Sequence, residues 1–102
     1  MSVATIKLLD EQFMEMFYFR KDQRATALNL QKGGRYRVQG TMGVPGLEGE
    51  AVAEEVFDLT NNPSREDQRE QLYGRDRSVS VGDIVNVDGV DYLCLSVGWK
   101  AL

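Results

Sequence analysis

The sequence predicts a small α+β domain with one antiparallel sheet and one main helix packed on it. The last quarter of the chain, RSVSVGDIVNVDGVDYLCLSVGWKAL, alternates β-branched and polar residues around an Asp-Gly pair, which is typical of a β-hairpin. Residues 47–60 repeat apolar side chains every three or four positions, as an amphipathic helix does. We therefore expect a single domain over residues 1–102, with the approximate order β-β-α-β-β.

Composition agrees with one self-folding domain. The chain has 102 residues, of which 42% are hydrophobic and 27% charged, far from the composition of disordered segments. A single Cys excludes an internal disulfide framework, and the sequence shows neither the pattern of a signal peptide nor an apolar run long enough to cross a bilayer. We expect a cytoplasmic protein without a membrane partner.

The charges are unevenly distributed along the chain. The formal net charge is −4, which argues against tight, non-specific binding of nucleic acid. Residues 1–40 nevertheless carry seven Lys or Arg against four acidic residues, whereas residues 41–62 carry five acidic residues and no basic one. Such a dipolar surface can steer a charged partner, although a solvated face on each of two surface elements explains it more simply.

The first half of the chain gives weaker signals. FMEMFYFR, residues 13–20, is apolar on both faces and predicts a central strand. Asp22 could cap a short helix that ends at Gly33-Gly34, but a strand is nearly as compatible with residues 22–34, and both alternatives stay open. Residues 35–42 predict a second strand, followed by a turn at GVPG.

The helix at 47–60 has clear signals at its ends. Glu48 and Glu50 lie in or near the first turn, where the helix dipole favours negative charge. At the other end, Asn61-Asn62-Pro63 predicts a left-handed residue followed by one that cannot continue a helix. The charged stretch 64–77 is expected to be a mobile loop, with a short helical turn ending at Gly74.

The C-terminal hairpin has a predicted register. A type I′ turn at Asp88-Gly89 places Val87 opposite Val90 and Val85 opposite Tyr92. One face then carries Val85, Val87, Val90, Tyr92 and Cys94, and the other carries Ile84, Leu93, Leu95, Val97 and Trp99. Because neither face is polar for long, we expect both to be buried, one of them by a helix.

Few residues suit catalysis or metal binding. The chain has no His, which removes the commonest general base and most zinc sites. Cys94 lies between two leucines and is expected to be a buried, inert thiol. Asp83, Asp88 and Asp91 lack the spacing of a calcium loop, and the glycine pairs match no phosphate-binding pattern. We expect no enzyme, no cofactor and no metal.

Gly82 and Asp83 have a structural explanation. We expect Gly82 to bend the chain, and the Asp83 carboxylate to accept backbone N–H bonds in that turn.

A local arginine series surrounds Tyr73, as in some loops that contact nucleic acids. The series consists of Arg65, Arg69, Arg75 and Arg77. Interspersed acidic residues cancel its charge, so a nucleic-acid partner is less favoured than a protein partner.

The second half contains the segments AEEVFDLTNNP, RSVSVGDIVNVDGVDYLC and the terminal VGWKAL. Together these segments resemble the YodL-like group of small domains found in phages, plasmids and integrative elements. The matching positions are Ser78, Ser80, Val81, Gly82, Asp83, Gly98 and Trp99. The resemblance implies a genetic setting and no particular reaction.

From that setting we expect a non-enzymatic binding protein of a phage or mobile element. Its partner would be a host or element-encoded protein, for example a defence system that it inhibits, as an anti-CRISPR does. The alternative is a small RNA- or DNA-binding module with an SH3-like or PUA-like hairpin. The sequence leaves the oligomeric state open.

The expected binding residues lie where the family-like segment meets the arginine series. Recognition commonly resides in loops beside rigid strands, and Arg and Trp are enriched at interface hot spots. The set is Arg75, Arg77, Ser78, Ser80 and Trp99. The competing interpretation is that Arg77 pairs with Asp76 or Asp83 and that both serines satisfy a sheet edge. The next candidate is the basic N-terminal region with Arg20, Arg35 and Arg37.

Overall fold

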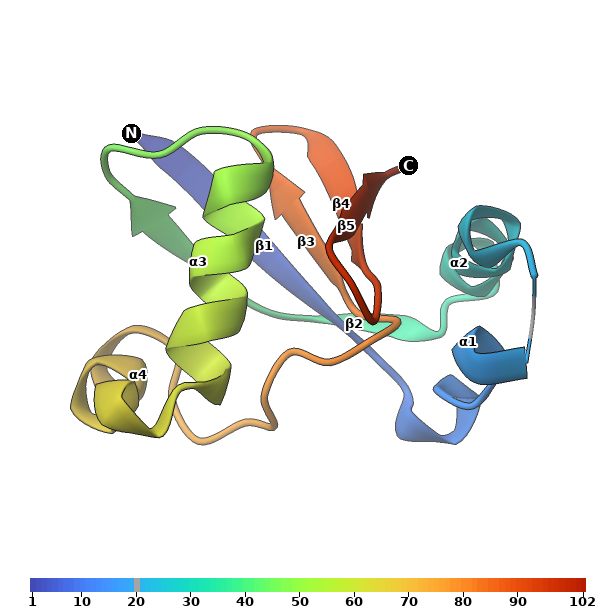
Figure 1. The fold of residues 1–102 in the computed structure, drawn as a ribbon, viewed down its shortest axis with the longest axis horizontal. Coiled ribbons are helices and arrows are strands. Elements are labelled where there is room, and N and C mark those ends of the chain that lie inside the picture. Colours follow the sequence, from blue (N-terminus) through green and yellow to red (C-terminus); the bar gives the residue numbers. More distant parts are fainter. Residues whose placement is uncertain (20) are drawn as a thin grey trace.

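The computed structural model describes residues 1–19 and 21–102, and it confirms the α+β class. Five strands form one antiparallel sheet in the order β2-β1-β3-β4-β5 (Figure 1). The strands are β1 (Ser2–Leu9), β2 (Tyr36–Val44), β3 (Ile84–Val87), β4 (Val90–Cys94) and β5 (Trp99–Ala101). The α-helices are α1 (Met16–Phe19), α2 (Gln23–Lys32), α3 (Glu50–Asn61) and α4 (Glu66–Leu72), and the 3₁₀ helices are η1 (Glu11–Phe13) and η2 (Pro63–Arg65).

β1, a strand that the sequence interpretation missed, lies inside the sheet. β1 pairs with β2 on one side and β3 on the other, so that Ile6 lies opposite both Gly40 and Val85. Ala4, Ile6 and Leu8 alternate with more polar residues and are buried beneath α3. The approximate order β-β-α-β-β is kept, but its first strand is β1 at Ser2–Leu9 instead of residues 13–20, and the chain forms α1 and α2 before β2.

The strand predicted at 13–20 is wrong for the residues that the structure describes; Arg20 lies outside them. Asp10 accepts a hydrogen bond from the Gln12 N–H and caps η1, and a further turn leads into α1. The helical conformation places Phe13, Met14 and Phe17, which are one and three residues apart, in one apolar cluster. Residues 13–19, although apolar on both faces of a strand, thus pack against the core as a short helical segment.

The open question at residues 22–34 is answered by a helix. The Asp22 side chain accepts a hydrogen bond from the Ala25 N–H, which caps α2, and α2 ends at Gly33. Gly34 has a φ of +73°, a conformation that glycine adopts without strain. The following strand is confirmed as β2, although it continues through Gly43 and Val44, two residues of the predicted turn.

The helix at 47–60 is confirmed, with later bounds. It begins at Glu50 because Gly49 has a φ of +57°, and it buries Val52, Val56 and Leu59. The predicted left-handed stop is wrong: Asn62 is extended (φ −90°, ψ 112°), and its side chain caps η2 by accepting from the Ser64 N–H.

The segment expected to be a loop at 64–77 contains α4, a full helix that extends beyond the predicted single turn. After α4, the buried hydroxyl of Tyr73 donates to the Arg77 carbonyl at 2.5 Å and so holds residues 73–77 in a compact turn. Burial raises the pKa of Tyr73 to about 12, so this hydroxyl remains a donor at neutral pH.

The hairpin register is confirmed. Val87 pairs with Val90 and Val85 with Tyr92, and both turn residues, Asp88 and Gly89, have positive φ as a type I′ turn requires. Val85, Val87 and Cys94 face the cluster beneath α3. Ile84, Leu93 and Leu95 face the opposite cluster, which α1 and α2 cover (Figure 1).

The prediction misplaces two residues after the hairpin, Val97 and Trp99. The chain turns at Ser96–Gly98, where the Leu95 N–H donates to the Gly98 carbonyl, and then reverses into β5. Because that turn resets the alternation, Trp99 lies opposite Cys94 and packs on the α3 face, while Val97 is 89% exposed. Among the described residues, no helix is long and apolar enough to span a bilayer.

Leu93 is expected to contribute strongly to stability because it is fully buried between β3, β5 and α2. Leu93→Ala should lower the free energy of unfolding by about 2–5 kcal/mol in a denaturant titration. Val97→Ala, at an exposed position, should change it by no more than about 0.5 kcal/mol. Similar small effects of both substitutions would show that this face is not core.

Candidate functional site

A buried carboxylate, Asp83, lies at the centre of the region where the binding residues were predicted. Its side chain has 0% exposure, and both oxygens are fully engaged. Oδ1 accepts from the Leu9 N–H at 2.8 Å and Oδ2 from the Ser80 N–H at 2.7 Å. Gly82, with a φ of +97°, makes the predicted bend. The turn interpretation is confirmed, and Asp83 in addition reaches the distant end of β1.

Arg77 completes this arrangement. Its two terminal nitrogens bind the two Asp83 oxygens at 2.6 and 2.8 Å, and one of them also donates to the Leu9 carbonyl at 2.7 Å. Hydrogen bonding to Asp83 raises the pKa of Arg77, so the guanidinium stays charged despite its partial burial. Arg77 therefore has the ion pair that the competing interpretation gave it.

The two predicted serines bind backbone groups. Ser78 Oγ donates to the Thr60 carbonyl at 2.6 Å and accepts from Arg69 at 3.1 Å. Ser80 Oγ donates to the Ser78 carbonyl at 3.3 Å. The Ser78 bond attaches the segment before β3 to the end of α3, and it leaves little of the Ser78 hydroxyl for a partner.

Arg75 and Trp99 lie apart from this cluster. The Arg75 side chain is 90% exposed and contacts Glu70 at 3.1 Å. Trp99 is held against α3: its Nε1 donates to Glu54 at 2.8 Å, and its ring meets Phe57 edge-on at 6.3 Å. The structure thus brings together Arg77, Ser78 and Ser80 but does not join Trp99 to them.

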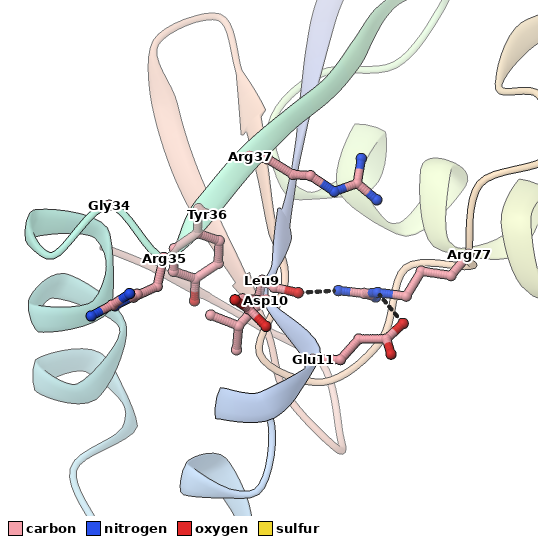
Figure 2. A pocket seen from close by; sticks show the side chains of 8 residues that line it. All are labelled: Leu9, Asp10, Glu11, Gly34, Arg35, Tyr36, Arg37 and Arg77. Carbon is pink, nitrogen blue, oxygen red and sulfur yellow. Dashed lines mark hydrogen bonds and ion pairs between the residues drawn. The ribbon is translucent and has the colours of Figure 1, made fainter.

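A groove of about 420 Å³ lies beside Arg77 (Figure 2). The end of β1 forms its floor, the start of β2 one wall and Arg77 another. Its lining residues are Leu9, Asp10, Glu11, Gly34, Arg35, Tyr36, Arg37 and Arg77. The groove therefore unites the predicted site at Arg77 with the second candidate region at Arg35 and Arg37; Arg20 lies outside the described residues.

Two arginines of the groove are accessible. Arg37 makes a two-pronged pair with Asp76 at 2.7 and 2.9 Å, and these hydrogen bonds raise the pKa of Arg37 and lower that of Asp76. The Arg37 side chain is 58% exposed and that of Asp76 30%, so solvent and salt screen this pair despite its two-pronged geometry. Arg35 stacks over Phe13 at 4.9 Å and makes no ion pair with another described residue.

The wall between these arginines is fixed. Figure 2 shows the Tyr36 ring between Arg35, which points toward α2, and Arg37, which points toward Arg77. The Tyr36 hydroxyl donates to the Gly82 carbonyl at 2.5 Å, and burial raises its pKa, so it is a permanent donor. The groove thus offers guanidinium groups to an anionic group, beside the carboxylates of Asp10 and Glu11.

Comparisons with protein-family models, with curated proteins and with solved structures give no match to this chain.

Asp83 should be the most sensitive polar position in the protein. Asp83→Ala leaves the Leu9 and Ser80 amides without an acceptor and removes the buried carboxylate that pairs with Arg77, so it should lower the free energy of unfolding by about 3–5 kcal/mol. Arg37→Ala, which removes only the exposed pair with Asp76, should cost less than about 1 kcal/mol. Denaturant titrations of both variants test this, and equal small losses would contradict it.

Cys94 should be unreactive in the native protein. Its side chain is buried, and burial, followed by the charge of Asp83, raises the pKa of the thiol to about 12. A thiol-specific chromogenic reagent at neutral pH should therefore modify the protein at a rate set by unfolding, and rapidly after denaturation. Equally rapid modification of native and denatured protein would show that the thiol is accessible.

Proposed function

We propose that this protein is a non-enzymatic binding protein that recognises carboxylates of a partner protein at the groove, with Arg35 and Arg37 as the contact residues. The observation that carries the proposal is the pair of accessible guanidinium groups on the groove's rim, of which Arg35 has no carboxylate partner among the described residues. Guanidinium groups bind carboxylates in a two-pronged geometry that combines affinity with orientation.

The rigidity of the groove supports this proposal. Tyr36 is held by Gly82, and the end of β1 is held by Asp83 and Arg77. A binding surface that is already ordered loses less conformational entropy when a partner binds. Arg37 can exchange Asp76 for a partner carboxylate at little cost, because surface pairs contribute about 0–1 kcal/mol.

The burial and bonding of the side chains that could act as nucleophile, acid or base support a non-enzymatic role. Cys94 is buried with a raised thiol pKa, Asp83 is fully bonded, and Tyr36 is a fixed donor. No group of three or more His, Cys, Asp or Glu that could hold a metal occurs within residues 1–19 and 21–102.

Nucleic acid is the second candidate, since residues 21–37 carry five basic residues and one acidic residue. The formal net charge of −4 argues against tight binding of a phosphate backbone, which requires several Lys or Arg contacts at once. For this reason the proposal commits to a protein partner.

The resemblance to YodL-like domains extends the proposal to the genetic setting. Under it, the chain is encoded by a phage or mobile element, and the carboxylates belong to a host or element-encoded protein such as a defence component. This part rests on the sequence motifs of the C-terminal half, whereas the groove supports only the chemistry of the contact.

The proposal can be tested by titrating the isotope-labelled protein with a short Asp/Glu-rich peptide and following backbone amide shifts. Shifts should concentrate at residues 34–37 and 77. Arg35→Ala and Arg37→Ala should each weaken binding about fivefold, which corresponds to about 1 kcal/mol. Lys100→Ala, which removes one exposed positive charge on β5, should bind like the unmodified chain.

Two further titrations decide between the alternatives. The Gln/Asn analogue of the peptide should not bind, and mixed oligonucleotides should bind weakly or not at all. Oligonucleotide binding that is tighter than peptide binding and falls steeply with salt would favour the nucleic-acid candidate. If Arg75→Ala or Trp99→Ala weakens peptide binding while Arg35→Ala does not, the recognition surface is the one predicted from sequence and the groove is wrong.

A further inference from the structure

The two faces of the sheet carry helices of opposite charge. The outward side of α2 presents Arg24, Leu28 and Lys32, which are all exposed, and residues 23–32 contain no acidic residue. On the other face of the sheet, the outward side of α3 presents Glu50, Glu54 and Asp58, which are also exposed. Figure 1 shows the two helices well separated, and they pack on the apolar clusters of opposite faces of the sheet.

The two rows match in spacing as well as in charge. Each consists of side chains four residues apart, which rise about 6 Å from one to the next along a helix. Arg24 and Lys32 have no ion pair with another described residue. The acidic row keeps capacity for a partner at two positions: Glu50 has no ion pair with another described residue, and Trp99 occupies only one oxygen of Glu54, whereas Asp58 is bonded to Arg65 and Asn62.

We infer that a second copy of this chain docks on the α2 row, with the α3 row of that copy facing it. Leu28, an apolar side chain 40% exposed between two cations, lies at the centre of this contact. The partner in this inference is distinct from the one proposed for the groove, and the contact uses neither Arg35 nor Arg37.

The position of the rows determines the kind of assembly. Because α2 and α3 lie on opposite faces of one copy, the contact joins different surfaces and leaves a free row at each end of a pair. Such a heterologous contact adds copies one after another and does not stop at a closed dimer. Exposed ion pairs are weak and screened by salt, so association requires high protein concentration and low ionic strength.

Sedimentation velocity of the full chain at low and high salt tests the inference. At low salt, the weight-average mass should rise continuously with protein concentration, and at high salt it should stay that of the monomer. Lys32→Glu should abolish the rise at low salt, whereas Lys100→Glu, the same charge reversal on β5, should preserve it. The matched pair separates an effect of the α2 row from an effect of net charge.

A complementation experiment identifies the opposing surface. Arg24→Glu/Lys32→Glu and Glu50→Lys/Glu54→Lys should each remain monomeric alone and should associate when mixed. A monomer at all salt concentrations, equal loss with Lys100→Glu, or no association in the mixture would each overturn the inference. The groove proposal is judged separately, because peptide binding by a monomeric chain would leave it intact.

Discussion

The contact between the buried Asp83 carboxylate and Arg77 joins the end of β1 to the turn before β3, beyond the last backbone pair of these two strands. Asp83 begins the segment that becomes β3, Leu9 ends β1, and Ser80 belongs to the strandless stretch after α4. A buried carboxylate is costly unless cations and donors surround it, and here Arg77 and two amides saturate both oxygens. The order of the sheet end formed by Leu9 and the turn before β3, which we call the lower end, depends on this one buried ion pair.

The groove is a consequence of that arrangement. Its floor is the end of β1, whose backbone Asp83 and Arg77 fix, and its wall is Tyr36, whose hydroxyl binds the turn at Gly82. Arg77 thus supports the groove, while Arg35 and Arg37 on its rim keep accessible guanidinium groups. This division explains why Arg77, whose guanidinium is bonded within the chain, is less suited to contact a partner than Arg35.

Local signals predicted the elements that local interactions stabilise. Asp22 caps α2, and Asp88-Gly89 makes the hairpin turn, as their side-chain chemistry requires. β1 was missed and residues 13–19 were misassigned, because which of two apolar segments enters a sheet is decided by pairing with β2 and β3, residues far along the chain. The face of the sheet on which Trp99 lies could not be predicted by counting along the strand, because the turn at Gly98 interrupts the alternation of faces. The Arg77–Asp83 pair was one of two open interpretations, whereas the groove could not be predicted without β1.

Native-state hydrogen exchange of the Leu9 and Ser80 amides tests the role of Asp83 most directly. Both amides donate to the Asp83 carboxylate. If this contact ties the lower end of the sheet to the core, both should exchange only through global unfolding. Their opening free energy should then equal that of the core amide of Val85. Exchange of either amide at a much lower opening free energy than that of Val85 would show that this end opens independently, and would contradict the account.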